Sequence, residues 1–445
     1  MPIRLYNRLL LCAIAAPLLV SGSTQQQPSL PFVLKPYKAC GIYEVGDKVG
    51  WTVEPGPSGW GRPPAPFSYV IKKNNHDVIK SGRVSWQTTD LRFDVAGNEP
   101  EMVYVTITWP AEAEPRNQIR RVFGAVVAPT KLRPAQPRPR DFDAFWKSKI
   151  KMLEDIPMNP VLTPKDSGKP DVEYATIQMD HINGAHVYGQ LAKPKGEGKF
   201  PALVIYQWAS PPYPLQKSWV TDRAAEGWLV LNIEPHDVLP DGPPSYYRAL
   251  PIELKNYAGI SQDDRDKCYF LQMYLADYRA VDYIAGRADW NGKTLVVNGT
   301  SMGGQQSLCV AGLHPKITHL IVEEPSGCDI DADLYGRQAG YPNFQTKNPK
   351  VAETAPYFDA INFASHIRAT SLVAMGFVDT VAPPTGIWTA YNQIRGRKEA
   401  APMFEAPHNN TATRAQQLPY SDRATAWLNA LVKGQRIPPP RPFGS

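Results

Sequence analysis

Between residues 202 and 434, short apolar runs alternate with segments of helical periodicity, and this alternation restricts the possible folds of the chain most strongly. The runs include ALVIYQ (202–207), WLVLNIE (228–234) and TLVVNG (294–299). A long segment at 268–286 has its apolar residues along one helical stripe. Runs that are apolar throughout are typical of strands buried on both faces. We therefore expect an α/β fold with a mostly parallel sheet and helices on both faces.

The alternation continues toward the C-terminus and begins after one upstream helix. Strands are predicted at 319–325, 371–377 and 402–407, and a closing helix at 423–434. The upstream segment DFDAFWKSKIKMLED (141–155) has helical apolar spacing and an aspartate placed to cap the helix. These elements assign residues 141–435 to one α/β domain.

A different pattern occupies the front of the chain. Short segments in residues 31–127 alternate apolar and polar side chains, which is typical of strands. The segments 68–75 and 76–84 predict a hairpin with asparagine at its tip. Several such strands at close spacing predict an all-β, immunoglobulin-like sandwich. The proline-rich stretch 128–140 is predicted to be the linker between the two domains.

The first 23 residues have the order of regions found in secretory signal peptides. Arg4 and Arg8 precede an apolar run at 9–20, and small residues follow at 21–23. The run is short for a membrane span, and no other segment approaches one. The sequence predicts a secreted or periplasmic protein with no membrane span in its mature chain.

Charge and cysteine content exclude some classes of partner and leave others open. The formal net charge of +6 falls to +4 without Arg4 and Arg8, and no basic stripe is present, so nucleic-acid binding is not expected. The spacing of the remaining cysteines resembles no metal site. An exported protein could oxidise them, so one disulfide or free buried thiols are both open. These cysteines are Cys40, Cys268, Cys309 and Cys328.

A glycine-flanked serine lies where a predicted strand passes into a predicted helix. Gly299, Ser301 and Gly303 form the pattern G-x-S-x-G directly after TLVV. In an α/β sheet this pattern is the nucleophile elbow of the α/β-hydrolase fold, in which a strained turn exposes the serine hydroxyl. The glycines are required because the sharp turn brings neighbouring backbone into contact. Ser301 is therefore the candidate nucleophile.

A serine nucleophile requires a base, and the base requires an acid that orients it. In the α/β-hydrolase fold these follow the serine in the order acid, then histidine. Asp379 comes just after the predicted strand 371–377, and only His408 then remains downstream among the histidines. The order selects Ser301, Asp379 and His408 as a catalytic triad. Glu353 and Asp359 are the spare acids.

Two backbone NH groups are expected to stabilise the oxyanion of an acyl-transfer reaction. One is that of Met302, the residue after the nucleophile, at the start of a helix. The other should come from the loop YQWASPP (206–212), where either Gln207 or Trp208 is a candidate. Such a mechanism requires no metal and no organic cofactor.

Several stretches resemble the acetyl xylan esterase and cephalosporin C deacetylase family, carbohydrate esterase family 7. They are DFDAFW (141–146), a segment at 186–204 similar to the family's early hairpin, the helix and elbow at 268–304, and the region of the acid at 375–400. The similarity extends over 141–434. It implies a serine esterase that removes acetyl groups from carbohydrate such as acetylated xylan, with Ser301, Asp379 and His408 as its triad.

The chain also departs from the family pattern. Met302 stands where the family usually has glutamine, and Asn409 follows the catalytic histidine where it usually has glutamate. The segment NIEPHDVLP (232–240) replaces the family's usual Arg-Gly-Gln motif. The β-rich front domain is also unlike the compact, hexamer-forming members, so the oligomeric state stays open.

Two other functions compete with the esterase. A serine peptidase of the prolyl-oligopeptidase type also joins a β domain to this fold, but about 100 residues are too few for its propeller. A non-enzymatic carbohydrate-binding protein could stack sugars on Trp51, Trp60 or Trp86 of the front domain. The predicted triad argues against a purely binding protein.

Overall fold

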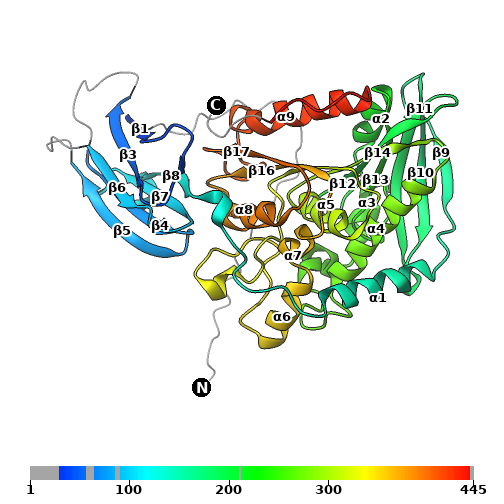
Figure 1. Ribbon diagram of the computed structural model, residues 1–445, viewed down its shortest axis with the longest axis horizontal. Coiled ribbons are helices and arrows are strands. Elements are labelled where there is room, and N and C mark those ends of the chain that lie inside the picture. The colour runs from blue at the N-terminus through cyan, green and yellow to red at the C-terminus, as the bar shows by residue number, and fades with distance from the viewer. Residues whose placement is uncertain (1–29, 57–64, 86–90, 210–211, 441–445) are drawn as a thin grey trace.

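The computed structural model describes residues 30–56, 65–85, 91–209 and 212–440, and the predicted signal peptide lies outside them. A β-rich domain lies at one end, beside a larger domain built on one long sheet (Figure 1). Within these residues no helix has the length and apolar character needed to cross a bilayer.

The front domain consists of two facing sheets, as the alternating pattern predicts. One has the strand order β1 (Phe32–Pro36), β3 (Lys48–Pro55), β6 (Arg92–Ala96). The other has the order β2 (Ile42–Tyr43), β8 (Ile119–Val127), β7 (Glu101–Trp109), β4 (Phe67–Lys73), β5 (Asp77–Val84). Both sheets contribute buried side chains to one core, so they form a sandwich. The predicted hairpin is confirmed as β4 and β5.

Trp51 belongs to the interior of this sandwich. Its side chain is fully buried, and its ring lies 5.8 Å from that of Phe93 in a stacked arrangement. The idea that Trp51 stacks on a sugar is therefore wrong, because both sheets cover its indole. Trp60 and Trp86 lie outside the described residues.

The larger domain is organised around one sheet with the order β17-β16-β15-β14-β12-β13-β11-β10-β9. Strands β12 to β17 pair in parallel, and β9, β10 and β11 add an antiparallel edge. The strands are β9 (Val161–Lys165), β10 (Val172–Asp180), β11 (His186–Pro194), β12 (Phe200–Tyr206), β13 (Leu229–Ile233), β14 (Trp290–Thr300), β15 (His319–Glu323), β16 (Thr370–Gly376) and β17 (Lys398–Met403). The predicted α/β sheet is confirmed.

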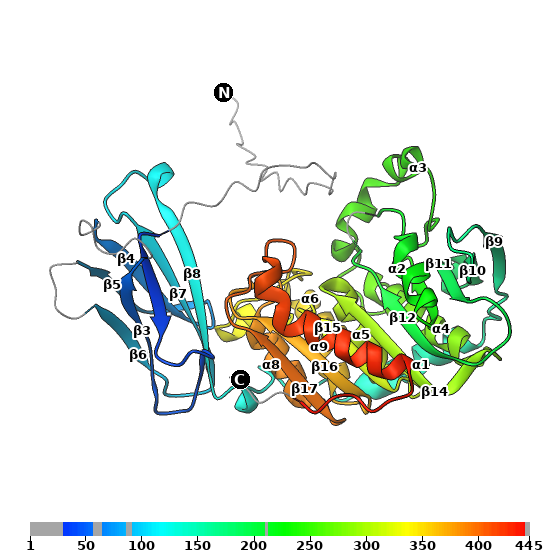
Figure 2. The same cartoon turned by 90° about the horizontal axis from the view of Figure 1, so that it is seen from above.

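Helices cover both faces of the sheet (Figures 1 and 2). Alternate residues of one strand point to opposite faces, so Val296 packs with α2 and α9 while Val297 packs with α4, α5 and α8. The helices are α1 (Phe142–Glu154), α2 (Lys217–Ala225), α3 (Pro244–Ala249), α4 (Tyr269–Gly286), α5 (Met302–Leu313), α6 (Pro349–Thr354), α7 (Ala360–Ala364), α8 (Pro384–Gln393) and α9 (Arg414–Val432). This burial on both faces explains the uniformly apolar strands.

Three local predictions need correction. Segment 186–204 is not a hairpin, because β11 pairs with β10 and β13, whereas β12 pairs with β13 and β14. The last strand lies at Lys398–Met403 and not at 402–407, since it pairs with β16 from Ser371 to Gly376. Asp141 precedes α1 but does not cap it, because its carboxylate accepts hydrogen bonds from Arg265 and Tyr357.

The cysteines of the described residues are all free thiols. Cys268, Cys309 and Cys328 are buried, and Cys40 is half-buried. The sequence left open one disulfide or free buried thiols, and the structure has free thiols at these four positions.

Candidate active site

The candidate nucleophile lies at the carboxyl edge of the sheet, where β14 turns sharply into α5. Ser301 has φ +58° and ψ −119°, a conformation rare for residues with a side chain. Its NH donates to the carbonyl of Glu323 at 2.9 Å. A Cβ on Gly299 would lie 2.2 Å from the Gly303 carbonyl carbon, and one on Gly303 would lie 2.0 Å from the Tyr206 oxygen. The two glycines are thus required by close backbone contact, as the motif predicts.

The three residues selected by chain order lie within hydrogen-bond distance of one another. His408 Nε2 lies 2.9 Å from Ser301 Oγ, and His408 Nδ1 lies 2.7 Å from Asp379 Oδ2. The other oxygen of Asp379, Oδ1, accepts from the NH groups of Val381 at 2.8 Å and Ala382 at 2.9 Å. These contacts fix the carboxylate, which in turn orients the imidazole. A serine, a base and an orienting acid in this geometry can perform nucleophilic acyl transfer.

Neighbouring parallel strands supply these side chains. Ser301 follows β14, Asp379 follows β16 and His408 follows β17, and these strands lie in the order β17-β16-β15-β14. Because carboxyl ends of parallel strands share one edge, residues far apart in sequence meet there.

The predicted oxyanion donors lie near Ser301, on α5 and on the loop after β12. Met302 is the first residue of α5, so its NH has no partner within the helix. Gln306 of α5 donates from Nε2 to the carbonyl of Gln207 at 2.9 Å, which packs the loop against the first turn of the helix. Gln207 is buried, whereas Trp208 is 38% exposed. Which of these two supplies the second NH stays a prediction.

The spare acids have other surroundings. Asp359 caps α7, and its carboxylate accepts from the NH groups of Ile330 at 2.8 Å and Ile361 at 2.9 Å. Glu353 lies within α6. Among the described residues, the acids that contact His408 are Asp379 and Glu324, and neither spare acid is one of them.

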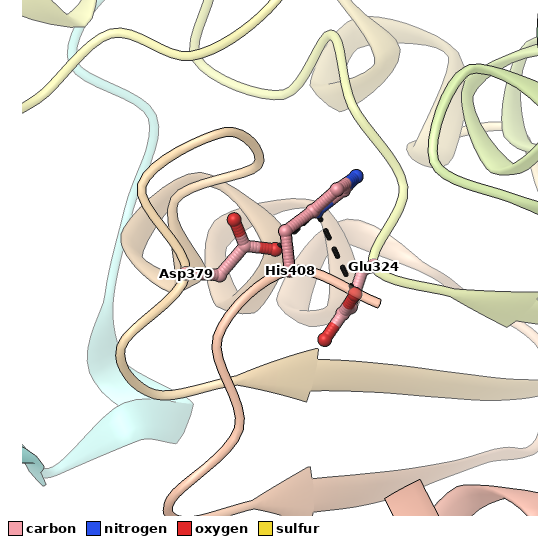
Figure 3. Close-up of side chains that lie close together, drawn as sticks. All are labelled: Glu324, Asp379 and His408. Carbon is pink, nitrogen blue, oxygen red and sulfur yellow. Dashed lines mark hydrogen bonds and ion pairs between the residues drawn. The ribbon is translucent and has the colours of Figure 1, made fainter. Parts of the chain in front are cut away.

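Sequence analysis missed Glu324, which follows β15 directly. Its Oε2 lies 3.6 Å from His408 Nδ1, the ring nitrogen that Asp379 also contacts (Figure 3). Burial, reinforced by the charges of Asp379 and Glu323, raises the pKa of Glu324 to about 9. The available signal was its position: like Asp379, it is an acid immediately after a late parallel strand.

Glu324, Asp379 and His408 also have the composition of a metal site, since one ligand atom from each lies within 4.8 Å of the others. Both ring nitrogens of His408 are already engaged, one by Ser301 and one by Asp379. A cation bound at Nδ1 would have to displace Asp379. The arrangement therefore fits a hydrogen-bonded imidazole better than a metal centre.

The front sandwich packs against the loop that carries Asp379. A Cβ on Gly124 of β8 would lie 2.5 Å from the carbonyl oxygen of Phe377, two residues before the aspartate. In the same loop, the carbonyl of Thr380 accepts from Gln338 Nε2 at 2.8 Å. Gln338 is itself held by Asn75 of the β4–β5 turn, whose Nδ2 donates to Gln338 Oε1 at 2.6 Å. The sandwich thus contacts the acid loop directly at Gly124 and indirectly through the hydrogen bond of Asn75 to Gln338.

Comparisons with known proteins show the family of the chain. The model of the acetyl xylan esterase (AXE1) family matches residues 129–428. The chain is 30% identical over 316 residues to acetyl esterase Axe7A of Xylanibacter ruminicola, covering 69% of this chain and 70% of the relative.

Solved structures show the same fold. Acetyl xylan esterase 1 from Thermoanaerobacterium sp. JW/SL YS485 aligns with a TM-score of 0.55 at 21% identity, covering 68% of this chain and 97% of that one. The acetyl xylan esterase from Paenibacillus sp. R4 aligns with a TM-score of 0.57 at 22% identity, covering 69% and 98%. With an α/β-hydrolase fold and a family match over most of its length, the chain belongs to the acetyl xylan esterase family and is an esterase.

Proposed function

We propose that this esterase removes acetyl groups from plant cell-wall carbohydrate, such as acetylated xylan or xylo-oligosaccharides, through an acetyl-enzyme on Ser301. The observation that carries the proposal is the contact of 2.9 Å between Ser301 Oγ and His408 Nε2. An imidazole at this distance from the hydroxyl that the strained turn exposes supports its role as the base. The similarity to acetyl xylan esterases and to an acetyl esterase supports acetyl transfer to water as the reaction.

The reaction has two halves. His408 Nε2 removes the proton of Ser301 as Oγ attacks the acetyl carbonyl, and Asp379 stabilises the imidazolium through Nδ1. The NH of Met302, with that of Gln207 or Trp208, donates to the oxyanion. His408 then protonates the departing sugar oxygen, and the acetyl group stays on Ser301. Water, activated by His408, releases acetate and restores the serine hydroxyl.

The test is a set of substrates that separates the candidate classes. The protein is incubated with acetylated xylan, acetylated xylo-oligosaccharides, cephalosporin C, p-nitrophenyl esters of increasing acyl length, and prolyl peptides. Acetate release from the carbohydrates, with kcat/KM falling as the acyl chain lengthens, is expected. Cleavage of peptides in preference to acetate esters would replace the proposal by the peptidase, and inactivity on every ester would leave only a binding role.

An exposed indole beside the site supports a sugar substrate. Trp208 is 38% exposed, and its ring lies 5.5 Å from those of Tyr213, in a stacked arrangement, and Trp219. Its neighbour Gln207 contacts the first turn of α5, which follows Ser301. An exposed aromatic side chain that packs against two others on the predicted oxyanion loop offers a flat apolar surface to a sugar ring.

Trp208→Ala is therefore expected to raise KM for acetylated xylo-oligosaccharides by about 10-fold, which corresponds to about 1.4 kcal/mol of lost binding. The kinetics with p-nitrophenyl acetate should stay within about 2-fold, because alanine keeps the backbone NH and this substrate has no sugar. Trp208→Phe, which keeps an aromatic surface, is the matched control. Equal losses on both substrates would assign Trp208 to the shape of the oxyanion loop instead.

A further inference from the structure

A second carboxyl group lies beside the imidazole of His408. Glu324 follows β15 and Asp379 follows β16, and these strands are paired in parallel along their length. Their ends therefore reach the same edge of the sheet, and the two acids lie beside His408 (Figure 3). Asp379 is the nearer, at 2.7 Å from Nδ1 against 3.6 Å for Glu324.

The surroundings hold the carboxyl group of Glu324 at this place. Its side chain is fully buried, and Oε2 accepts from the NH of Asn409, the residue after the histidine, at 2.6 Å. Its backbone has φ +44°, and its NH donates to Ala374 of β16 at 3.0 Å. A Cβ on Gly376 would lie 2.8 Å from Oε1, so that glycine leaves room for the carboxyl group.

Part of the hydrogen-bonding capacity of Glu324 is unused. Among the described residues, Oε1 has no hydrogen-bond partner although it is buried. A buried carboxyl group that satisfies only one oxygen costs free energy, which core packing alone does not explain. A carboxyl group held next to an imidazole can instead act on that imidazole.

The charge state of Glu324 depends on Asp379. Burial, together with the nearby charges of Asp379 and Glu323, raises the pKa of Glu324 to about 9, so it is protonated at neutral pH. A neutral carboxyl group does not compete with Asp379 for the Nδ1 proton. Loss of the charge at Asp379 removes one of the causes of this shift, and the imidazolium formed during catalysis then favours the glutamate anion.

We propose that Glu324 is a second positioning acid for His408, which takes over the imidazole when Asp379 is neutral or absent. The inference rests on the proposed function. The shift it requires is small, since Oε2 is 3.6 Å from Nδ1 and a hydrogen bond needs about 2.8 Å.

The test compares Glu324→Gln in two backgrounds. Glutamine resembles the protonated glutamic acid in shape, so in the otherwise natural protein kcat for p-nitrophenyl acetate should fall less than about 3-fold. Asp379→Ala should lower kcat by about 10²-fold, less than the roughly 10⁴-fold loss that follows when a triad acid has no substitute. Adding Glu324→Gln to Asp379→Ala should remove about another 10²-fold.

A purely structural role would give the same factor in both backgrounds and would overturn the inference. So would an Asp379→Ala variant that loses about 10⁴-fold by itself and nothing more with Glu324→Gln. Ser307→Ala is the control, because that buried hydroxyl donates to the carbonyl of Gly303 at 2.8 Å and should behave alike in both backgrounds. Should Asp379→Ala unfold, Asp379→Ser replaces it, since a serine hydroxyl can still accept from the NH of Val381 and carries no NH2 group that would donate to His408 Nδ1.

A spectroscopic readout separates the two roles further. The low-field proton resonance of an Nδ1–H bonded to a carboxylate should persist in Asp379→Ala and disappear in the double variant. Its absence from Asp379→Ala would contradict the proposal. Failure of the triad itself is recognised separately, because Ser301→Ala would then stay active.

Discussion

Replacing Ser301 by alanine is expected to lower kcat/KM for p-nitrophenyl acetate by about 10⁴- to 10⁶-fold, to the level that the oxyanion donors alone sustain. The hydroxyl lies 2.9 Å from the base, and no acetyl-enzyme can form without it. Alanine should be tolerated structurally, since the strain is in the backbone. Circular dichroism and the thermal midpoint should therefore be unchanged, and the loss should appear in kcat.

The matched control is Ser307→Ala, on the same helix. The Ser307 hydroxyl is buried and donates to the carbonyl of Gly303 at 2.8 Å. Its loss is expected to cost stability of about 1 kcal/mol and to leave kcat within about 3-fold. If Ser301→Ala and Ser307→Ala had the same activity, the assignment of the nucleophile would be wrong.

Replacing His408 by alanine is expected to lower kcat by a similar factor, about 10⁴-fold or more. Without the imidazole the serine keeps its proton and the sugar oxygen has no acid to protonate it. Because the two residues act as a unit, the double variant of Ser301 and His408 should be no slower than either single one. Kinetics of the three variants with p-nitrophenyl acetate measure this.

His366→Ala is the control for His408. His366 is half-buried beside Arg138, and its Nε2 lies 2.8 Å from the guanidinium Nη1. Its replacement by alanine should leave kcat unchanged. If the loss of kcat in the Ser301 and His408 double variant equalled the product of the two single losses, the two side chains would act independently. That result would contradict a proton transfer shared by the two residues.

Much of the site could be predicted because its determinants are local or ordered along the chain. The two glycines around Ser301 reflect a turn that allows no side chain, since a Cβ at either would contact backbone at 2.2 Å or less. Asp379 and His408 each follow a buried strand, and parallel strands bring such positions to one edge. The order of acid and then histidine along the chain then excludes the other histidines as the base.

Other features depend on which strands become neighbours, which local pattern does not encode. Glu324 resembles any acid after a strand until β15 is placed between β14 and β16. The contact of Gly124 with Phe377 joins residues from different domains, and the sequence pattern does not predict it either. The sequence around Trp51 is compatible with either a binding surface or a core position. The two facing sheets bury its side chain and so place it in the core.

The support of the acid loop by the sandwich changes the interpretation of the front domain. From sequence it could be a separate binding module joined by a linker. In the structure, Asn75 and Gln338 form a hydrogen-bonded path to Thr380, the residue after Asp379. Burial, together with the negative charge of Asp379, raises the pKa of the phenol of Tyr104 in β7. The sandwich is therefore part of the surroundings that position the triad.

The most direct test of the central proposal, nucleophilic catalysis by Ser301, is covalent trapping with a p-nitrophenyl phosphonate ester. Its phosphorus resembles the tetrahedral intermediate and leaves a stable bond on the attacking oxygen. Mass spectrometry of the digested protein should find one phosphonyl group, on the peptide that contains Ser301, in proportion to lost activity. Ser301→Ala should remain unlabelled. A phosphonyl group on another residue, or full activity in labelled protein, would contradict the account.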